Sequence, residues 1–228
     1  MTPTPLRPLS LLEARVAAVL VEKQASVPDS YPLTLNALVA GCNQKTARDP
    51  VIAATDSDVL QAVDALKSLN LVIEVSGSRV SRYEHNVRRV LGVPSQSQAL
   101  LAILMLRGPQ TAAELRSGSE RLHRFADISS VEAFLDELAA REPPLVARLA
   151  RSAGAREQRW AHLLSGEPPS AAARSAGAAD GGGGSDDPIA AGEIAALKAG
   201  QRRMADEIAV LRGQLARLAA ELGVTLDD

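Results

Sequence analysis

The sequence has few aromatic residues and almost no cysteine. Phe, Trp and Tyr together make up 2% of the 228 residues, so the core has to be built from aliphatic side chains. Binding of single-stranded nucleic acid by base stacking, which needs exposed rings, is therefore not expected. The single cysteine, Cys42, excludes an internal disulfide and a metal cluster built from cysteines.

Long apolar runs and an excess of charge are also missing. No apolar run reaches the roughly 18 residues that a membrane span needs, and the opening MTPTPLRPLS is rich in proline without an apolar signal core. The net charge of −2 and the pI of about 6.0 give no overall basic character for a polyanionic partner. We expect a soluble, cytoplasmic protein that does not contact membranes.

Recognisable catalytic and metal-binding motifs are absent. The three histidines, His85, His123 and His162, lack the spacing of a zinc site. Although a single sequence leaves a serine–histidine–acid triad open, there is no G-x-S-x-G frame, and Gly181–Gly184 lacks the Lys-Ser/Thr pair of a phosphate-binding loop. We therefore expect no enzymatic activity, no cofactor and no metal, and structural roles for His85 and His162 at hairpin ends.

Residues 9–91 show the order of elements of a winged helix-turn-helix domain, which is three helices followed by a hairpin. Capping boxes at Ser10–Glu13 and Thr55–Asp58 mark two of the helix starts. Two prolines in Ser26–Pro32 end the first helix. The predicted helices run from Ser10 to about Gln24, from Thr34 to about Gly41 and from Thr55 to about Asn70, and the predicted strands are Leu71–Val75 and Arg79–Tyr83.

Residues 95–164 repeat that order, which favours a duplication over a chance coincidence of two short patterns. The predicted helices run from Ser95 to Arg107, from Thr111 to about Arg116 and from Ser129 onward, and the predicted strands are Leu145–Leu149 and Arg156–Trp160. The connection His85–Pro94 contains Val90, Leu91 and Val93, so we expect the two domains to pack closely together. Residues 1–8 are predicted to be a disordered N-terminus.

The remaining chain divides into a linker and a helical tail. Residues 165–192 are rich in Ala, Gly, Pro and Ser and contain almost no large apolar residue, which predicts a flexible linker. Residues 193–223 show a heptad repeat, so they predict a parallel coiled coil and hence a homodimer. The alternative is an amphipathic helix that packs on its own domains. The coiled-coil seam would consist of Ile194, Leu197, Gln201, Met204, Ile208, Leu211, Leu215, Leu218 and Leu222.

Several stretches resemble a known bacterial family. EARVAAVLVEK (13–23), YPLTLNAL (31–38), CNQK (42–45), SRVSRYEH (78–85) and LMLRGPQTAAELR (104–116) are similar to the YceH-like family, whose function is unassigned. The resemblance covers roughly residues 9–164. It implies two tandem winged helices and brings no catalytic residues. Together with the patterns above, it predicts a mainly α protein with small β-hairpins, of the α+β class.

The choice of partner lies between protein and DNA. The third helix of each domain has a net acidic polar side, the wrong sign for a groove lined with phosphates. Basic residues cluster elsewhere, either as a solvated face or as a contact surface for a nucleic-acid backbone; they are Lys45, Arg48, Arg79, Arg82, Arg88 and Arg89. The loop Asn43–Pro50 is interpreted either as capping of the second helix or as a binding loop. We favour a scaffold for an unidentified protein partner, and the alternative is a DNA-binding regulator or a weak, non-specific DNA binder.

Overall fold

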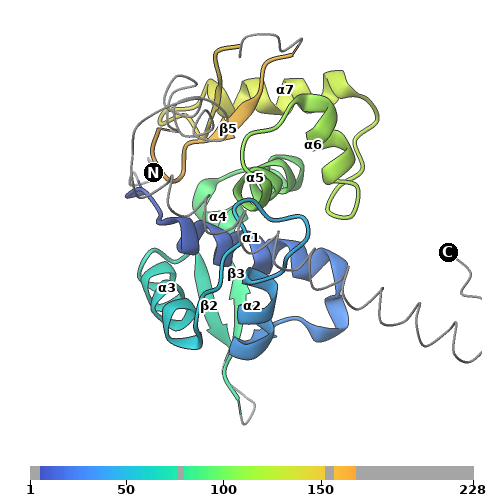
Figure 1. Cartoon of the computed structure of the whole chain (residues 1–228). Helices are drawn as coiled ribbons and strands as arrows, with labels where there is room; N and C mark the ends of the chain where they lie inside the picture. The colour runs from blue at the N-terminus through green and yellow to red at the C-terminus, as the bar shows by residue number, and fades with distance from the viewer. Residues whose placement is uncertain (1–5, 76–79, 152–156, 168–228) are drawn as a thin grey trace, which may run out of the picture. The chain divides into compact units, whose positions relative to one another are not determined.

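The computed structural model describes residues 6–75, 80–151 and 157–167 (Figure 1). Within these ranges the chain forms a helix-rich α+β fold with two small antiparallel sheets. The described residues all belong to one compact unit, residues 1–174. The predicted coiled-coil helix 193–223, and all but the first three residues of the predicted linker 165–192, lie outside the described residues.

The first three α-helices start where the sequence predicts them. Helix α1 (Leu11–Ser26) opens with the Ser10–Glu13 capping box, in which Glu13 N donates to Ser10 Oγ at 3.2 Å and Ser10 N donates to Glu13 Oε2 at 2.7 Å. A short 3-10 helix, η1 (Pro28–Ser30), follows it. Helix α2 (Leu35–Cys42) is capped by Thr34 and helix α3 (Asp56–Ser68) by Thr55. Local hydrogen bonds therefore fix these helix starts.

The first sheet contains one strand that the sequence analysis missed. Strands β1 (Leu33–Thr34), β2 (Val72–Val75) and β3 (Arg82–His85) pair in the order β1-β3-β2. The second hairpin strand thus starts at Arg82, which corrects the predicted Arg79–Tyr83. In the observed register Tyr83 lies opposite Leu33 and shares a buried face with Val72. A shift by one residue would turn these side chains toward solvent.

The connection between the two halves contains a further helix, α4 (Val87–Leu91), that was not predicted. Val87 and Leu91 are buried. The helix ends at Gly92, whose φ of 60° is left-handed and suits glycine. The Arg141 guanidinium donates to Leu91 O at 2.7 Å and to Gly92 O at 3.3 Å, so the second half of the chain caps this helix.

In its described residues, the second half contains three helices and one hairpin. Helices α5 (Ser95–Arg107), α6 (Ala112–Gly118) and α7 (Ile128–Ala139) precede strands β4 (Val146–Arg148) and β5 (Trp160–His162). The cap of α7 is Asp127, not the predicted Ser129, because Ser130 N donates to Asp127 Oδ1 at 2.7 Å. Strand β5 begins at Trp160, which corrects the predicted Arg156–Trp160.

Helices α1 and α5 form the centre of the unit and pack directly against each other, as Figure 1 shows. Both helices are buried along most of their length, and one apolar cluster contains residues of both halves. The cluster extends to Leu6, and Arg7 forms an ion pair with Glu13. Residues 6–8 are therefore held by the fold, which corrects the prediction of disorder for this part of residues 1–8.

Candidate interaction surfaces

The polar loop after α2 is tied down from within. Asn43 Nδ2 donates to Ala54 O at 2.8 Å, and Ala54 N donates to Asn43 Oδ1 at 2.8 Å. Asp49 N donates to Leu106 O at 2.8 Å, which joins the loop to α5. These bonds support the capping interpretation of the loop, since its polar groups are used by the fold itself.

Arg48 is a structural residue and is not available to nucleic acid. Its side chain is fully buried and forms an ion pair with Glu22 at 2.5 Å. Its Nε donates to Gly41 O at 3.2 Å. Because the guanidinium is enclosed and paired, it has no surface to offer to a phosphate, and this corrects the sequence-based assignment of Arg48 to a nucleic-acid contact.

A second arginine is buried beside Arg48. Arg15 is 1% exposed, and its guanidinium donates to Cys42 O at 3.2 Å and to Pro50 O at 2.7 Å. Burial, with the nearby charge of Arg48, lowers the pKa of Arg15. Burial also raises the pKa of the Cys42 thiol to about 12, so this cysteine is protonated at neutral pH and is no nucleophile.

The other predicted basic residues differ in their surroundings. Arg79 lies outside the described residues. The Arg82 guanidinium donates to Pro32 O at 2.8 Å. Lys45, Arg88 and Arg89 are exposed. Within the part of the chain that the structure describes, these three are thus the only members of the predicted nucleic-acid set that are exposed.

Two of the histidines are half-buried at the strand ends. His85 Nε2 lies 2.7 Å from Gln24 Oε1, and its backbone N donates to the Tyr31 hydroxyl at 2.7 Å. Burial, with a smaller contribution from Arg88, lowers the pKa of His85 to about 4. Burial lowers the pKa of His162 to about 4 as well. The described residues include no group of three or more His, Cys, Asp and Glu placed to hold a metal ion.

An apolar groove runs on both sides of Leu11, a leucine that is 50% exposed although it opens the central helix α1. On one side a hollow of about 600 Å³ separates Leu9 and Leu11 from Met105 and Pro109. On the other side a hollow of about 560 Å³ lies between Leu11 and the segment Ile52–Ala54. We call these two hollows together the Leu11 groove. It extends over residues from both halves of the chain.

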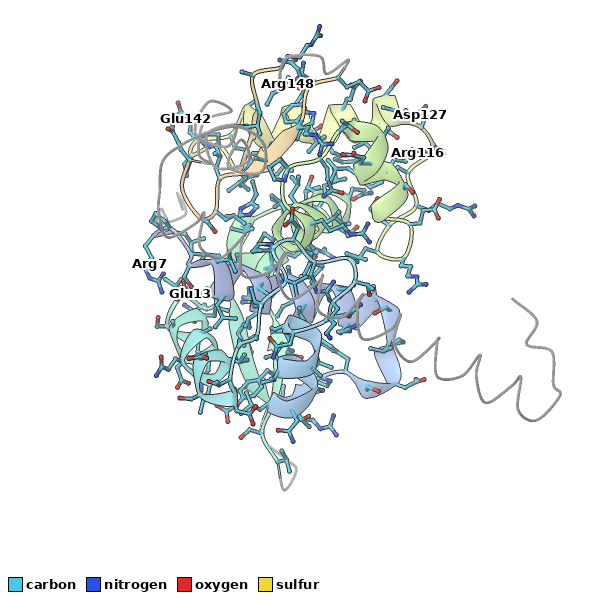
Figure 2. The ribbon with its side chains drawn as sticks, viewed as in Figure 1. Arg7, Glu13, Arg116, Asp127, Glu142 and Arg148 are labelled. Atoms are coloured by element: carbon cyan, nitrogen blue, oxygen red, sulfur yellow. The ribbon has the colours of Figure 1, made fainter. Side chains whose placement is uncertain are left out.

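The charged residues of the Leu11 groove are all acidic. The carboxylates are those of Glu13, Asp49, Asp58 and Glu167, and among the described residues no Lys or Arg lines either hollow. Glu13 is already paired, because Arg7 Nη2 lies 2.7 Å from its Oε1, and Figure 2 shows the two side chains next to each other near the start of α1. In the described part of the chain, Asp49 and Glu167 form no ion pair.

No helix in the described residues has the length and apolar character needed to cross a membrane.

Sequence reasoning did not identify the Leu11 groove, because its walls come from parts of the chain that are far apart in the sequence. They are α1, the loop before α3, α3 itself, the end of α5, and β5 with the residues that follow it. Leu11 itself carries a weak signal, since it is a leucine at the first position after a helix cap.

Comparison with known proteins places the chain in a family. A model of the family "Protein of unknown function, DUF480" matches residues 9–155. A UPF0502 protein of Methylibium petroleiphilum is 68% identical over 221 residues, covering 97% of this chain and 93% of the relative. A UPF0502 protein of Burkholderia multivorans is 63% identical over 228 residues, covering 99% and 95%. One from Leptothrix cholodnii is 63% identical over 221 residues, covering 97% and 98%. With matches of this extent, and in agreement with the resemblance to YceH-like proteins, the chain belongs to the DUF480/UPF0502 family of uncharacterised bacterial proteins.

Proposed function

We propose that this protein is a non-enzymatic, cytoplasmic interaction module. Its two halves are tandem winged helices, the Leu11 groove binds a segment of a protein partner, and the C-terminal helix makes the protein a homodimer. The repeated element order supports the winged-helix assignment, since α1–α3 are followed by the β2–β3 hairpin and α5–α7 by the β4–β5 hairpin.

The observation that carries the proposal is the Leu11 groove. Large apolar side chains exposed in a concave surface are typical of binding sites for other proteins. The acidic residues around the groove add a preference for charge. We therefore expect the partner segment to be a short apolar stretch flanked by lysine or arginine. This segment would lie between the Asp49 and Glu167 carboxylates.

The third helices support a protein partner over DNA. On α3 the basic residue Lys67 is already paired with Asp64 at 3.5 Å and with Glu74 at 2.5 Å. On α7, Asp136 pairs with Arg148 at 3.0 Å. These helices offer a phosphate backbone little free positive charge. DNA binding through Lys45, Arg88 and Arg89 is the weaker alternative, and we expect it to be salt-sensitive and indifferent to sequence.

Leu11→Gln should abolish partner binding without unfolding the protein, because the Leu11 side chain is half exposed and lies outside the apolar core cluster. Tagged wild type, Leu11→Gln and the matched control Leu60→Gln would be compared by affinity capture and quantitative mass spectrometry. Leu60 is also an exposed leucine, on α3, but it does not line the groove. We expect a protein that wild type and Leu60→Gln retain and Leu11→Gln loses.

The outcome that contradicts this proposal is equal recovery of every protein by the three chains. Duplex DNA of one defined sequence, bound by all three at physiological salt, would favour the regulator alternative instead.

The full chain is expected to dimerise and a chain truncated after Arg174 is expected to be monomeric. The heptad residues, from Ile194 to Leu222, form a narrow apolar seam, and burying each large side chain is worth about 1.5–3 kcal/mol before ordering costs. The relatives match the chain along nearly its whole length, so the tail is part of what they share. Sedimentation equilibrium at tens of micromolar measures the difference. Two monomers, or two dimers of equal affinity, would exclude the tail as the dimerisation element.

A further inference from the structure

A separate cleft lies where the two halves meet. Its charged residues are basic, whereas those of the Leu11 groove are acidic. The cleft has a volume of about 680 Å³. Gln24 from the end of α1 forms one wall, Arg88 and Arg89 from α4 form another, and Gln98 from the start of α5 forms a third. Leu122, from the loop between α6 and α7, borders it as well. The Leu11 groove and this cleft share no lining residue.

The charge of the cleft is entirely positive. Its lining, as far as the described residues form it, contains Arg88 and Arg89 and no Asp or Glu. Both arginines are exposed, and neither forms an ion pair within the described ranges 6–75, 80–151 and 157–167. Guanidinium groups that line a cleft and are not paired with a carboxylate there are suited to bidentate, charge-assisted hydrogen bonds to an oxyanion.

The floor of the cleft is polar and held in place by the fold. Gln98 is only 6% exposed, and its Nε2 lies 3.3 Å from His85 Nε2, which in turn lies 2.7 Å from Gln24 Oε1. These two side-chain contacts link α1, β3 and α5. Helix α5 begins beside the cleft, at the lining residue Ser95, and it has no side-chain cap, so its first backbone amides are free of a capping side chain.

Part of the remaining lining is apolar, beside the polar Asn86. Val21 and Ala25 of α1, Ala99 of α5 and Leu122 give the cleft a surface without charge beside the arginines. A volume of this size is typical of sites for small organic ligands. The site is therefore built for a molecule with an anionic group at one end and an uncharged body.

We propose that this cleft binds a small organic phosphate, with its phosphate group on Arg88 and Arg89 and its organic part against Val21, Ala99 and Leu122. A nucleic-acid backbone fits less well, because it needs an extended basic surface, and Arg48 and Arg82, which could have extended one, are engaged with Glu22 and Pro32. The inference does not depend on the proposed protein partner, since the two surfaces are separate.

The test is isothermal titration calorimetry of the full chain with inorganic phosphate, adenosine monophosphate and a short DNA duplex. Wild type is expected to bind both small probes saturably, and adenosine monophosphate more tightly than phosphate. The double variant Arg88→Gln/Arg89→Gln should weaken binding roughly tenfold to a hundredfold, as expected for the loss of charge-assisted hydrogen bonds. The matched control Arg151→Gln removes an exposed arginine that does not line the cleft and should leave binding unchanged.

Each remaining outcome overturns the assignment. Wild type that binds neither small probe, or three chains that bind them equally, would show that the arginine pair is not a phosphate site. A duplex bound more tightly than adenosine monophosphate, and lost in the double variant, would assign the cleft to nucleic acid. Thermal unfolding of each variant, expected to match wild type, shows that the loss of binding is not a loss of fold.

Discussion

Arg48→Met is expected to destabilise the protein by about 3 kcal/mol, the scale for removing one partner of a buried ion pair. The Arg48 side chain is fully buried, and the Glu22 side chain beside it is 17% exposed. Without the guanidinium, the Glu22 carboxylate keeps, among the described residues, only Lys23 as an ion-pair partner, at 3.8 Å, and the Gly41 carbonyl loses a donor. The free energy of unfolding, obtained from urea titration, measures the loss.

A double-mutant cycle separates the ion pair from the packing of Arg48. Glu22→Gln and the double variant Arg48→Met/Glu22→Gln complete the cycle, and the double variant should be less destabilised than the sum of the singles. The surface pair Lys67–Glu74 is the matched control, with side chains 35% and 33% exposed. Lys67→Met should cost less than about 1 kcal/mol. If Arg48→Met cost no more than Lys67→Met, the buried pair would not hold the loop.

The free energy of unfolding is expected to fall steeply as the pH is lowered from 7 to 4. The pKa values of His85 and His162 are about 4 in the folded protein, against about 6.5 for an unperturbed histidine. Between these values the unfolded chain binds protons that the folded chain does not. Stability therefore rises with pH across this window and is lost as the pH falls, by about 3 kcal/mol for each histidine if the whole window is crossed.

Histidine variants isolate this effect from acidic groups that also titrate. The hydrogen bond from Arg7, with the charge of that residue, lowers the pKa of Glu13, and hydrogen bonds from Thr55 lower the pKa of Asp58. These carboxylates therefore lose their stabilising effect at still lower pH. His85→Gln/His162→Gln should flatten the dependence between pH 4 and 6.5, whereas His123→Gln, the matched control, should keep it. Urea unfolding at several pH values gives the three profiles. Parallel profiles for the wild type and the double variant would refute the assignment.

Helix starts could be predicted from the sequence because their signals are local. The capping boxes at Ser10, Thr55 and Thr111 each form between two residues that are three positions apart. A short stretch of sequence therefore contains both partners. The predicted start of α7 was wrong, because Ser129 and Ser130 resemble caps in the sequence. In the structure Asp127 is the cap, and its side chain accepts the hydrogen bond from Ser130 N.

The positions of β1, β3 and β5 and the burial of charged residues could not be predicted in the same way, whereas the predicted Leu71–Val75 and Leu145–Leu149 agree closely with β2 and β4. The start of β5 is set by hydrogen bonds between Trp160 and Gln110, which are far apart in the chain. The burial of Arg48 depends on Glu22, a residue of another helix. A guanidinium in a polar loop has the same sequence pattern whether it faces solvent or a buried carboxylate.

The Leu11 groove shows the same limit for the candidate site. Its apolar walls become one surface only when α1 packs against α5, and the place of Leu11 directly after a helix cap is only a weak signal that this leucine stays exposed. The cleft lined by Arg88 and Arg89 could be predicted in part, since these two arginines are adjacent in the sequence. The absence of carboxylates around them follows only from the fold.

In-cell photo-crosslinking tests the central claim, a protein partner in the Leu11 groove, most directly. A photoreactive benzoylphenylalanine would replace Leu11 in one full-length chain and Leu60, which is exposed but lies outside the groove, in another. The expected result is a discrete protein adduct from position 11 that is absent from position 60. The account would be contradicted by no adduct at position 11, by the same adducts at both positions, or by an adduct with nucleic acid in place of protein.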